Sequence, residues 1–286
     1  MGFISEIFGY LLNFLYNIFQ NYGIAIIVFS VILRIILIPL TVKQQTTMRK
    51  SSKIQAKMQE LQQKYKNNPE KLNQEMMELY KTEKMNPLSG CFSSIIQLLI
   101  ILSVFWLVSQ PLTYMKKVDP QVIENYKTEI QQENGSSSSY YPEIEIIEKK
   151  GAEDENVYIN MDFLGIDLSK VPTASLNDWR VYIIPVLYVI TSFISIKMTT
   201  SAQKKAMKKK EIVIENGETK QPDDLDSSMQ QMNNTMLYMM PIMSISIAIV
   251  APLGLALYWL VSNVLMIIER LIIDKVMTNK EEQENG

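Results

Sequence analysis

Four long stretches without a charged residue constrain this chain most strongly. They cover residues 7–33, 85–115, 181–196 and 227–268 of the 286 residues. Because a helix needs roughly 20 mostly apolar residues to cross a bilayer, these stretches are candidate membrane spans. The mean hydropathy of +0.02 conceals them, since the charged residues are concentrated in the segments between the stretches. The sequence therefore predicts an integral membrane protein.

The residue types that the chain lacks exclude several kinds of chemistry. There is no histidine, which excludes histidine-dependent triads, histidine proton relays and histidine zinc sites. The single cysteine, Cys91, lies in an apolar stretch, so no intramolecular disulfide can form. No glycine-rich phosphate loop occurs. We therefore expect no enzyme activity, no metal, no cofactor and no nucleotide hydrolysis by this chain.

The uncharged stretches predict an all-α fold with five membrane-spanning helices. The last stretch is too long for one helix, and the motif APLG at 251–254 supplies proline and glycine near its centre. It therefore divides into two spans joined by a tight turn. The predicted spans cover residues 22–42, 87–110, 181–197, 235–250 and 255–273.

The first 21 residues predict an amphipathic helix that lies in the outer membrane interface. Polar side chains recur at spacings of four and three residues, at Glu6, Tyr10, Asn13, Asn17 and Gln20. This spacing places them along one stripe of a helix. A cleaved signal peptide is the alternative, but the only charge near the start is acidic and no basic region precedes the apolar run.

The polar segments between the spans predict the orientation. Residues 43–86 hold ten basic and five acidic residues, and a basic cluster at 204–210 opens the loop 198–234. The loop 111–180 instead holds seven basic and 13 acidic residues. Positively charged loops remain in the cytoplasm. We therefore expect the N-terminus and the acidic loop outside, and the short acidic tail 274–286 in the cytoplasm.

Two of these polar segments have a recognisable internal pattern. In residues 43–86, two sets of helically spaced apolar residues flank KNNPEK, where Asn68 as N-cap and Pro69 as first helical residue predict a second helix. This segment therefore reads as a cytoplasmic helical hairpin. In the outer loop, the low-complexity run NGSSSSYYPEIEIIEKKGAEDE at 134–155 predicts a mobile insert.

An arginine halfway along the first span is the main candidate functional residue. On insertion scales, an arginine at a span centre costs at least about 2.5 to 3.5 kcal/mol, so Arg34 needs a compensating environment. The sequence offers no acidic partner within the spans before Glu269, near the inner end of the last helix. Arg34 could be solvated by backbone and polar side chains in a purely structural role, belong to an anion pore, or face a water-containing groove.

Other polar residues of the spans are weaker signals. Ser30 lies four residues before Arg34, on the same helix face. Gln97 forms a small polar stripe with Ser93 and Ser94 in the second span. In the last span, two pairs of residues lie four apart: Tyr258 with Ser262 and Trp259 with Asn263. Such groups more often make hydrogen bonds between helices than form a site.

Four motifs in order resemble one family. They are VILRIILIPLTVKQ around Arg34, NPLSGCFSSIIQ, MDFLGIDLS at 161–169 and PLGLALYWLVSN. Together they are similar to the YidC-type membrane protein insertases, which are relatives of the mitochondrial Oxa-type and plastid Alb-type proteins. The resemblance covers about residues 20–273 and has the same five-span topology.

The resemblance implies five helices around a hydrophilic groove that is closed to the outside and open to the cytoplasm and to lipid. It matches Arg34, Gln97, Tyr258 and Trp259 to residues of this client-binding groove. Ser30, Ser93 and Ser94 join the predicted groove because their spacing places them on the helix faces of Arg34 and Gln97. The implied partners are nascent membrane-protein clients and the lipid bilayer, with the ribosome, the signal-recognition-particle receptor and the Sec translocon as further candidates. No recognition of nucleic-acid sequence is expected.

The sequence therefore predicts an insertase and chaperone of the bacterial plasma membrane that works without nucleotide hydrolysis. In this hypothesis Arg34 attracts the acidic residues of a client's hydrophilic tail into the groove. An anion channel or transporter that uses Arg34 is the alternative from another class. A purely structural chaperone, which binds inserted clients without moving their tails, is the third.

Overall fold

The structure is a computed structural model that describes the backbone of residues 2–65, 68–82, 89–133, 139–211 and 246–285. It divides into two compact units. The first comprises Met1–Ile36, Leu98–Ser192 and Met243–Gly286, and the second comprises Leu37–Gln97 and Phe193–Ile242. Each unit is described by itself.

The described chain is mostly helical, as the sequence predicts. Three helices are long and apolar enough to cross a membrane, over Tyr22–Thr47, Trp179–Met198 and Leu253–Ile273. A shorter apolar helix covers Ile95–Ser109. The class of all-α membrane protein is therefore confirmed. Most of the predicted span 235–250 lies outside the described residues. Its last five residues, 246–250, are described and are helical.

The helices that carry these spans have the following bounds. Helix α2 covers Tyr22–Lys64, α4 covers Ser89–Ser109, α7 covers Ile183–Glu211 and α9 covers Leu253–Asn285. The side chain of Asn21 caps the start of α2, because its Oδ1 accepts a hydrogen bond from the Ile24 amide at 3.1 Å. The first span and the following polar segment form one continuous helix, although Pro39 removes one backbone donor from its interior.

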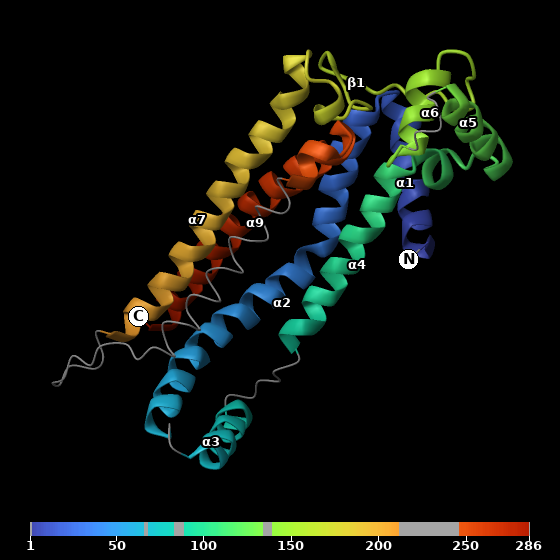
Figure 1. Cartoon of the computed structure of the whole chain (residues 1–286). Coiled ribbons are helices and arrows are strands. Elements are labelled where there is room, and N and C mark those ends of the chain that lie inside the picture. The colour runs from blue at the N-terminus through green and yellow to red at the C-terminus, as the bar shows by residue number, and fades with distance from the viewer. Residues whose placement is uncertain (1, 66–67, 83–88, 134–138, 212–245, 286) are drawn as a thin grey trace. The chain divides into compact units, whose positions relative to one another are not determined.

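Helix α1 (Gly2–Phe19), labelled in Figure 1, has three faces that differ in burial and polarity. One face is buried, since Ser5 donates a hydrogen bond to the Ser103 carbonyl of α4 at 3.0 Å and the Phe8 ring meets Phe29 of α2 edge to face. A second face carries the predicted polar stripe, which is mostly exposed. A third face exposes large apolar side chains: Phe3, Ile7, Phe14 and Ile18. The third face is suited to contact with lipid.

A small cap folds between α4 and α7. It contains the π-helical turn η1 (Leu112–Lys116), α5 (Pro120–Glu133), α6 (Pro142–Lys150), the antiparallel strands β1 (Asp162–Phe163) and β2 (Ile166–Asp167), and the 3-10 turns η2 (Pro172–Ala174) and η3 (Trp179–Tyr182). Lys150 joins α6 to α5, with its Nζ at 2.6 Å from Glu129 and 3.3 Å from Glu133.

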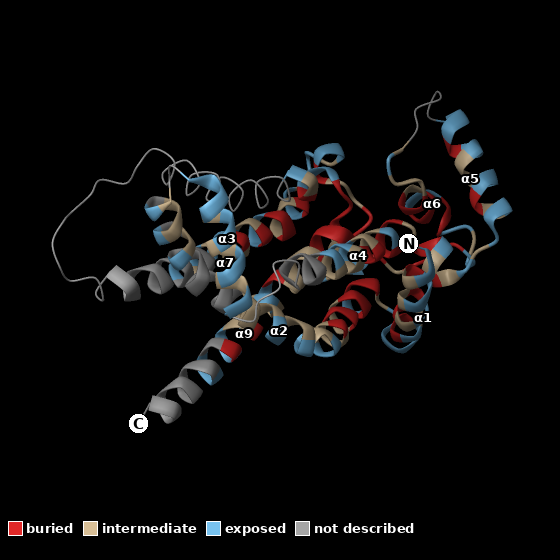
Figure 2. Cartoon of the chain, turned by 90° about the horizontal axis from the view of Figure 1, so that it is seen from below, coloured by how far each residue is buried: buried red, intermediate tan, exposed pale blue. Residues whose placement is uncertain are grey.

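Part of the insert that the sequence analysis expected to be mobile is a helix packed into this cap. Within α6, Ile144, Ile146 and Ile147 are buried, and Figure 2 shows this helix mostly in the colour of buried residues. Residues 142–150 of the low-complexity run therefore form a packed helix. Low-complexity composition concealed a short amphipathic helix that begins at Pro142, a residue well suited to the first helical position.

The second unit contains the end of α2 and the helix α3 (Pro69–Thr82). The Asn68 side chain accepts a hydrogen bond from the Lys71 amide at 3.1 Å, so the predicted N-cap is confirmed. The Tyr65 hydroxyl lies 3.2 Å from Glu75, and the Tyr80 hydroxyl 3.2 Å from the Met58 sulfur. Helix α3 has no buried residue, which leaves most of its surface open to solvent or to a partner.

Candidate functional site around Arg34

Arg34 forms an ion pair with Glu269. Its Nε lies 3.2 Å from Glu269 Oε2, and its Nη2 donates a hydrogen bond to the Ser262 carbonyl at 3.3 Å. The side chains of Arg34 and Glu269 are only 15% and 9% exposed. The expectation that Arg34 lacks an acidic partner is therefore wrong.

The helix starts explain how two residues so distant in sequence meet. The first residues of α2 and α9 lie at the same end of their unit (Figure 1). At 1.5 Å per residue, Arg34 lies about 18 Å from the start of α2 and Glu269 about 24 Å from the start of α9. The difference of about 6 Å along the axis is within the reach of two long side chains. The sequence alone does not give this register.

The pair is close in distance but incompletely hydrogen-bonded. Among the described residues, neither Arg34 Nε nor either Glu269 oxygen has a hydrogen-bond partner of good geometry. A buried ion pair repays the loss of hydration only with excellent geometry and further hydrogen bonds. Glu269 therefore compensates the charge of Arg34, but hydrogen bonds do little to hold the Glu269 carboxylate in place.

The predicted aromatic pair of the last span divides between two environments. Tyr258 is buried and lies one helical turn before Ser262, whose carbonyl accepts the hydrogen bond from Arg34 Nη2. The Trp259 ring instead faces α7, with its centroid 6.3 Å from that of Tyr188. Tyr258 therefore shares the helix face of Ser262, and Trp259 packs against Tyr188 of α7.

Asn263 connects α9 to α7. Its Nδ2 donates hydrogen bonds to Thr191 Oγ1 at 3.2 Å and to Ser192 Oγ at 3.1 Å. The sequence analysis favoured interhelical hydrogen bonding for this residue, and the structure confirms it. These two hydrogen bonds hold α9, which carries Trp259, against α7, which carries Tyr188.

The remaining predicted groove residues are placed as follows. Ser30 is buried and donates its hydroxyl hydrogen bond to the Ile26 carbonyl of its own helix at 2.7 Å. Gln97 is half-buried and belongs to the second compact unit, whereas Arg34 belongs to the first. Ser93 and Ser94 lie on α4, but their side chains are outside the described residues. The grouping of these four with Arg34 stays a prediction.

The motif at 161–169 and its neighbours hold the N-terminal ends of α2 and α9 by backbone hydrogen bonds. The Tyr22 amide donates to the Asn160 carbonyl at 3.0 Å, and the Leu253 and Gly254 amides donate to the carbonyls of Lys170 and Leu168 at 2.9 Å. The first amides of a helix have no partner within it. This segment supplies those partners for both α2 and α9, and so fixes the register that brings Arg34 to Glu269.

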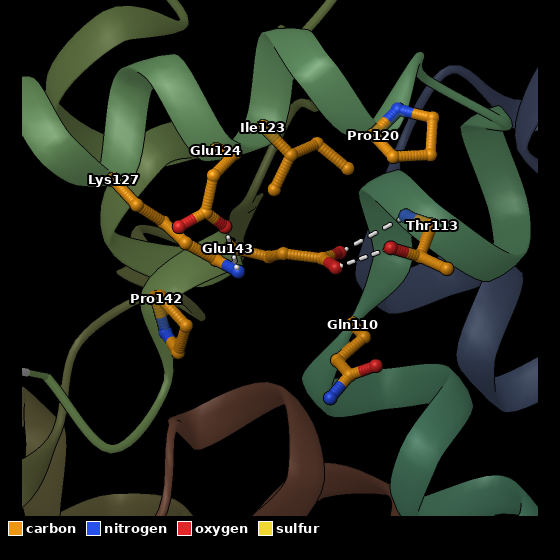
Figure 3. Close-up of a pocket in the computed structure, with 8 residues that line it drawn as sticks. All are labelled: Gln110, Thr113, Pro120, Ile123, Glu124, Lys127, Pro142 and Glu143. Atoms are coloured by element: carbon orange, nitrogen blue, oxygen red, sulfur yellow. Dashed lines mark hydrogen bonds and ion pairs between the residues drawn. The ribbon is translucent and has the colours of Figure 1, made fainter.

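A cavity of about 200 Å³ lies in the cap, lined by Gln110, Thr113, Pro120, Ile123, Glu124, Lys127, Pro142 and Glu143 (Figure 3). Glu143 is buried beside it and accepts two hydrogen bonds from Thr113, from the amide at 3.0 Å and from the hydroxyl at 2.5 Å. Burial raises the pKa of the Glu143 carboxyl, and the bonds from Thr113 only partly oppose this rise. The hydrogen bonds between Glu143 and Thr113 attach α6, which lies within the low-complexity run 134–155, to η1.

Within the described part of the chain, no cluster of three or more acidic, cysteine or histidine residues could hold a metal ion. Apolar helices of membrane-spanning length and a buried charge pair between two of them define a helical integral membrane protein. Residues 14–281 match the family described as "60Kd inner membrane protein". The chain belongs to this family.

Three relatives in different bacteria carry the same name. A Treponema denticola protein called membrane protein insertase YidC is 27% identical over 278 residues, which cover 96% of this chain and 38% of that protein. Proteins with the same name are 45% identical over 108 residues in Buchnera aphidicola and 42% identical over 105 residues in Caldanaerobacter subterraneus. These matches cover 38% and 37% of this chain, and 20% and 51% of those proteins. The comparisons do not support the anion-channel alternative.

Proposed function

We propose that this chain is a membrane protein insertase and chaperone that receives the hydrophilic tail of a client near Arg34. The observation that carries the proposal is a buried arginine between two spans, in a chain of a family whose relatives are named as insertases. The Arg34 guanidinium supplies the charge that a client's acidic tail residues would bind.

The energetics of insertion do not require a nucleotide in this proposal. A tail that enters a hydrated groove has a shorter hydrocarbon distance to cross, which lowers the penalty for its polar groups. Burial of the client's own apolar span in lipid supplies the driving force, at about 25 cal/mol per Å² of apolar surface. The chain therefore acts by lowering a barrier.

The finer architecture belongs to the same proposal. Five spans enclose the groove, with α1 in the outer interface and both the hairpin at 43–86 and the C-terminal tail in the cytoplasm. The exposed apolar face of α1 and the basic excess of residues 43–86 support this orientation. The contacts of Tyr65 with Glu75 and of Tyr80 with Met58 support the hairpin.

The cytoplasmic hairpin is the proposed docking element for partners. Helix α3 is open along its length and carries Lys71 and Lys81 among acidic residues, a surface suited to charged partners. The ribosome, the signal-recognition-particle receptor and the Sec translocon are the partners that an insertase of this kind would meet there.

Reconstitution tests the proposal. The purified protein is placed in liposomes with a single-span client, and the tail that reaches the lumen is measured as a protease-protected fragment. We expect protection that requires the protein, with no chloride flux through the same vesicles. Flux without protection would indicate a channel instead. Client binding without tail transfer would indicate the structural chaperone.

A further inference from the structure

Glu269 occupies the position that an acidic client residue would need. Its carboxylate lies 3.2 Å from Arg34 Nε and is buried. From this contact we propose that Glu269 is a built-in competitor for carboxylates at Arg34 and sets which clients the site prefers. The inference rests on the proposed function and deepens it, because it assigns a specificity-determining residue to the same site.

The position of Glu269 along α9 places it on the inner side of the arginine. Ser262 accepts the hydrogen bond from Arg34 Nη2, and Glu269 lies seven residues further along the same helix, about 10 Å at 1.5 Å per residue. The guanidinium is therefore held between a carbonyl toward the outer end and a carboxylate toward the inner end. A tail that enters from the cytoplasm meets Glu269 before it meets Arg34.

The hydrogen bonding of the pair favours exchange. In the described part of the chain, neither oxygen of Glu269 accepts a hydrogen bond of good geometry. Arg34 Nη2, by contrast, donates a hydrogen bond to the Ser262 carbonyl. A carboxylate fixed only by its charge can be replaced by one that approaches the planar guanidinium with two parallel bonds. Glu269 thus neutralises Arg34 at rest and releases it when a better acceptor arrives.

The pairing of Glu269 with Arg34 affects how strongly the site prefers acidic client tails to uncharged ones. While Glu269 faces Arg34, the pair is neutral as a whole, so it attracts an acidic tail less strongly than the uncompensated charge of Arg34 would. Affinity for an acidic tail is the difference between two arginine–carboxylate contacts, because one forms as the other breaks. Without the carboxylate, the full charge of Arg34 acts on the client.

The test measures binding of two matched client peptides to the full chain in nanodiscs. Both peptides contain the same apolar span, and their tails differ only in two Asp residues or two Asn residues. The quantity compared is the ratio of the two affinities. In Glu269→Gln we expect the preference for the Asp tail to rise by at least about fivefold, since one buried counter-charge is removed.

Two further variants make the result decisive. Glu6→Gln makes the same chemical change at an exposed position of α1 and is expected to leave the ratio unchanged. Glu269→Asp keeps the charge but shortens the side chain, so its ratio is expected between those of wild type and Glu269→Gln. If Glu269→Gln fails to fold, Glu269→Ala takes its place, because it also removes the carboxylate and is expected to raise the preference for the Asp tail by at least about fivefold.

An affinity ratio that stays within about twofold of wild type in a folded variant that lacks the Glu269 carboxylate would overturn the proposal. A merely structural ion pair predicts that outcome, with both affinities reduced together. The binding assay and the reconstitution assay together separate the carboxylate competition from the proposed function. If no client is inserted by the wild type but the ratio rises as expected, the proposed function fails and the carboxylate competition stands. If clients are inserted and the affinity ratio does not change, the proposed function stands and the carboxylate competition fails.

Discussion

Gly9 of α1 lies directly against the main-chain carbonyl of Tyr114 in η1. A β-carbon at this position would overlap that carbonyl, so only glycine permits the observed approach. The contact brings α1 against the cap, next to the residues that attach the insert. The N-terminal helix is therefore packed directly against the cap.

Gly9→Ala is expected to destabilise the protein by about 1 to 3 kcal/mol, because backbone must shift to admit the methyl group. Thermal unfolding in detergent measures this, with Gly2→Ala as the matched control. Gly2 lies on the same helix and has nothing within 4 Å of an added β-carbon. Equal melting temperatures for the two variants would contradict the packing described.

Asn263→Leu is expected to destabilise the protein by about 0.6 kcal/mol, and at most by about 1.7 kcal/mol, since it removes the hydrogen bonds from α9 to α7. A double-mutant cycle with Ser192→Ala measures the coupling. A coupling energy near zero would show that these bonds do not hold the helices together.

The buried carboxyl of Glu143 makes the stability of the cap dependent on pH. Its pKa is raised above the ordinary value of 4.5, so the folded state binds this proton more tightly than the unfolded state. The contribution of Glu143 to stability is therefore greatest when the carboxyl is protonated and declines as pH rises above about 4.5 through the raised folded-state pKa.

In Glu143→Gln this part of the pH dependence is expected to disappear. Amide hydrogen exchange of α6 between pH 4.5 and 7.5 measures it, after correction for the intrinsic exchange rate. Protection should fall more steeply with pH in wild type than in the variant. Parallel pH profiles would show that the burial of this carboxyl has no energetic effect.

The sequence predicts some features of this protein because they depend on local patterns. The apolar stretches give the spans, the start of α3 follows from Asn68 and Pro69, and the insertion penalty singles out Arg34. Each of these needs only the residues within a few helical turns. The family resemblance rests on four such local motifs.

Other features depend on relations that no local pattern contains. The partnership of Arg34 with Glu269 requires the register of two helices more than 200 residues apart, which the segment 160–170 fixes through backbone hydrogen bonds. The hydroxyl of Ser30 bonds its own helix, a choice that helical spacing does not reveal. Helix α6 was concealed by its acidic, serine-flanked surroundings.

The most direct test of the account compares two clients with tails of equal length, one acidic and one uncharged, in proteoliposomes with wild type, Arg34→Ala or Arg34→Lys. Arg180→Ala, which removes an exposed arginine of the cap, is the control for loss of a positive charge. We expect Arg34→Ala to reduce protection of the acidic tail by about tenfold while the uncharged tail is little affected. Arg34→Lys should retain most activity if charge alone matters, and its failure would indicate that the planar guanidinium is needed. Equal insertion of both clients by wild type and Arg34→Ala would contradict the central role of Arg34.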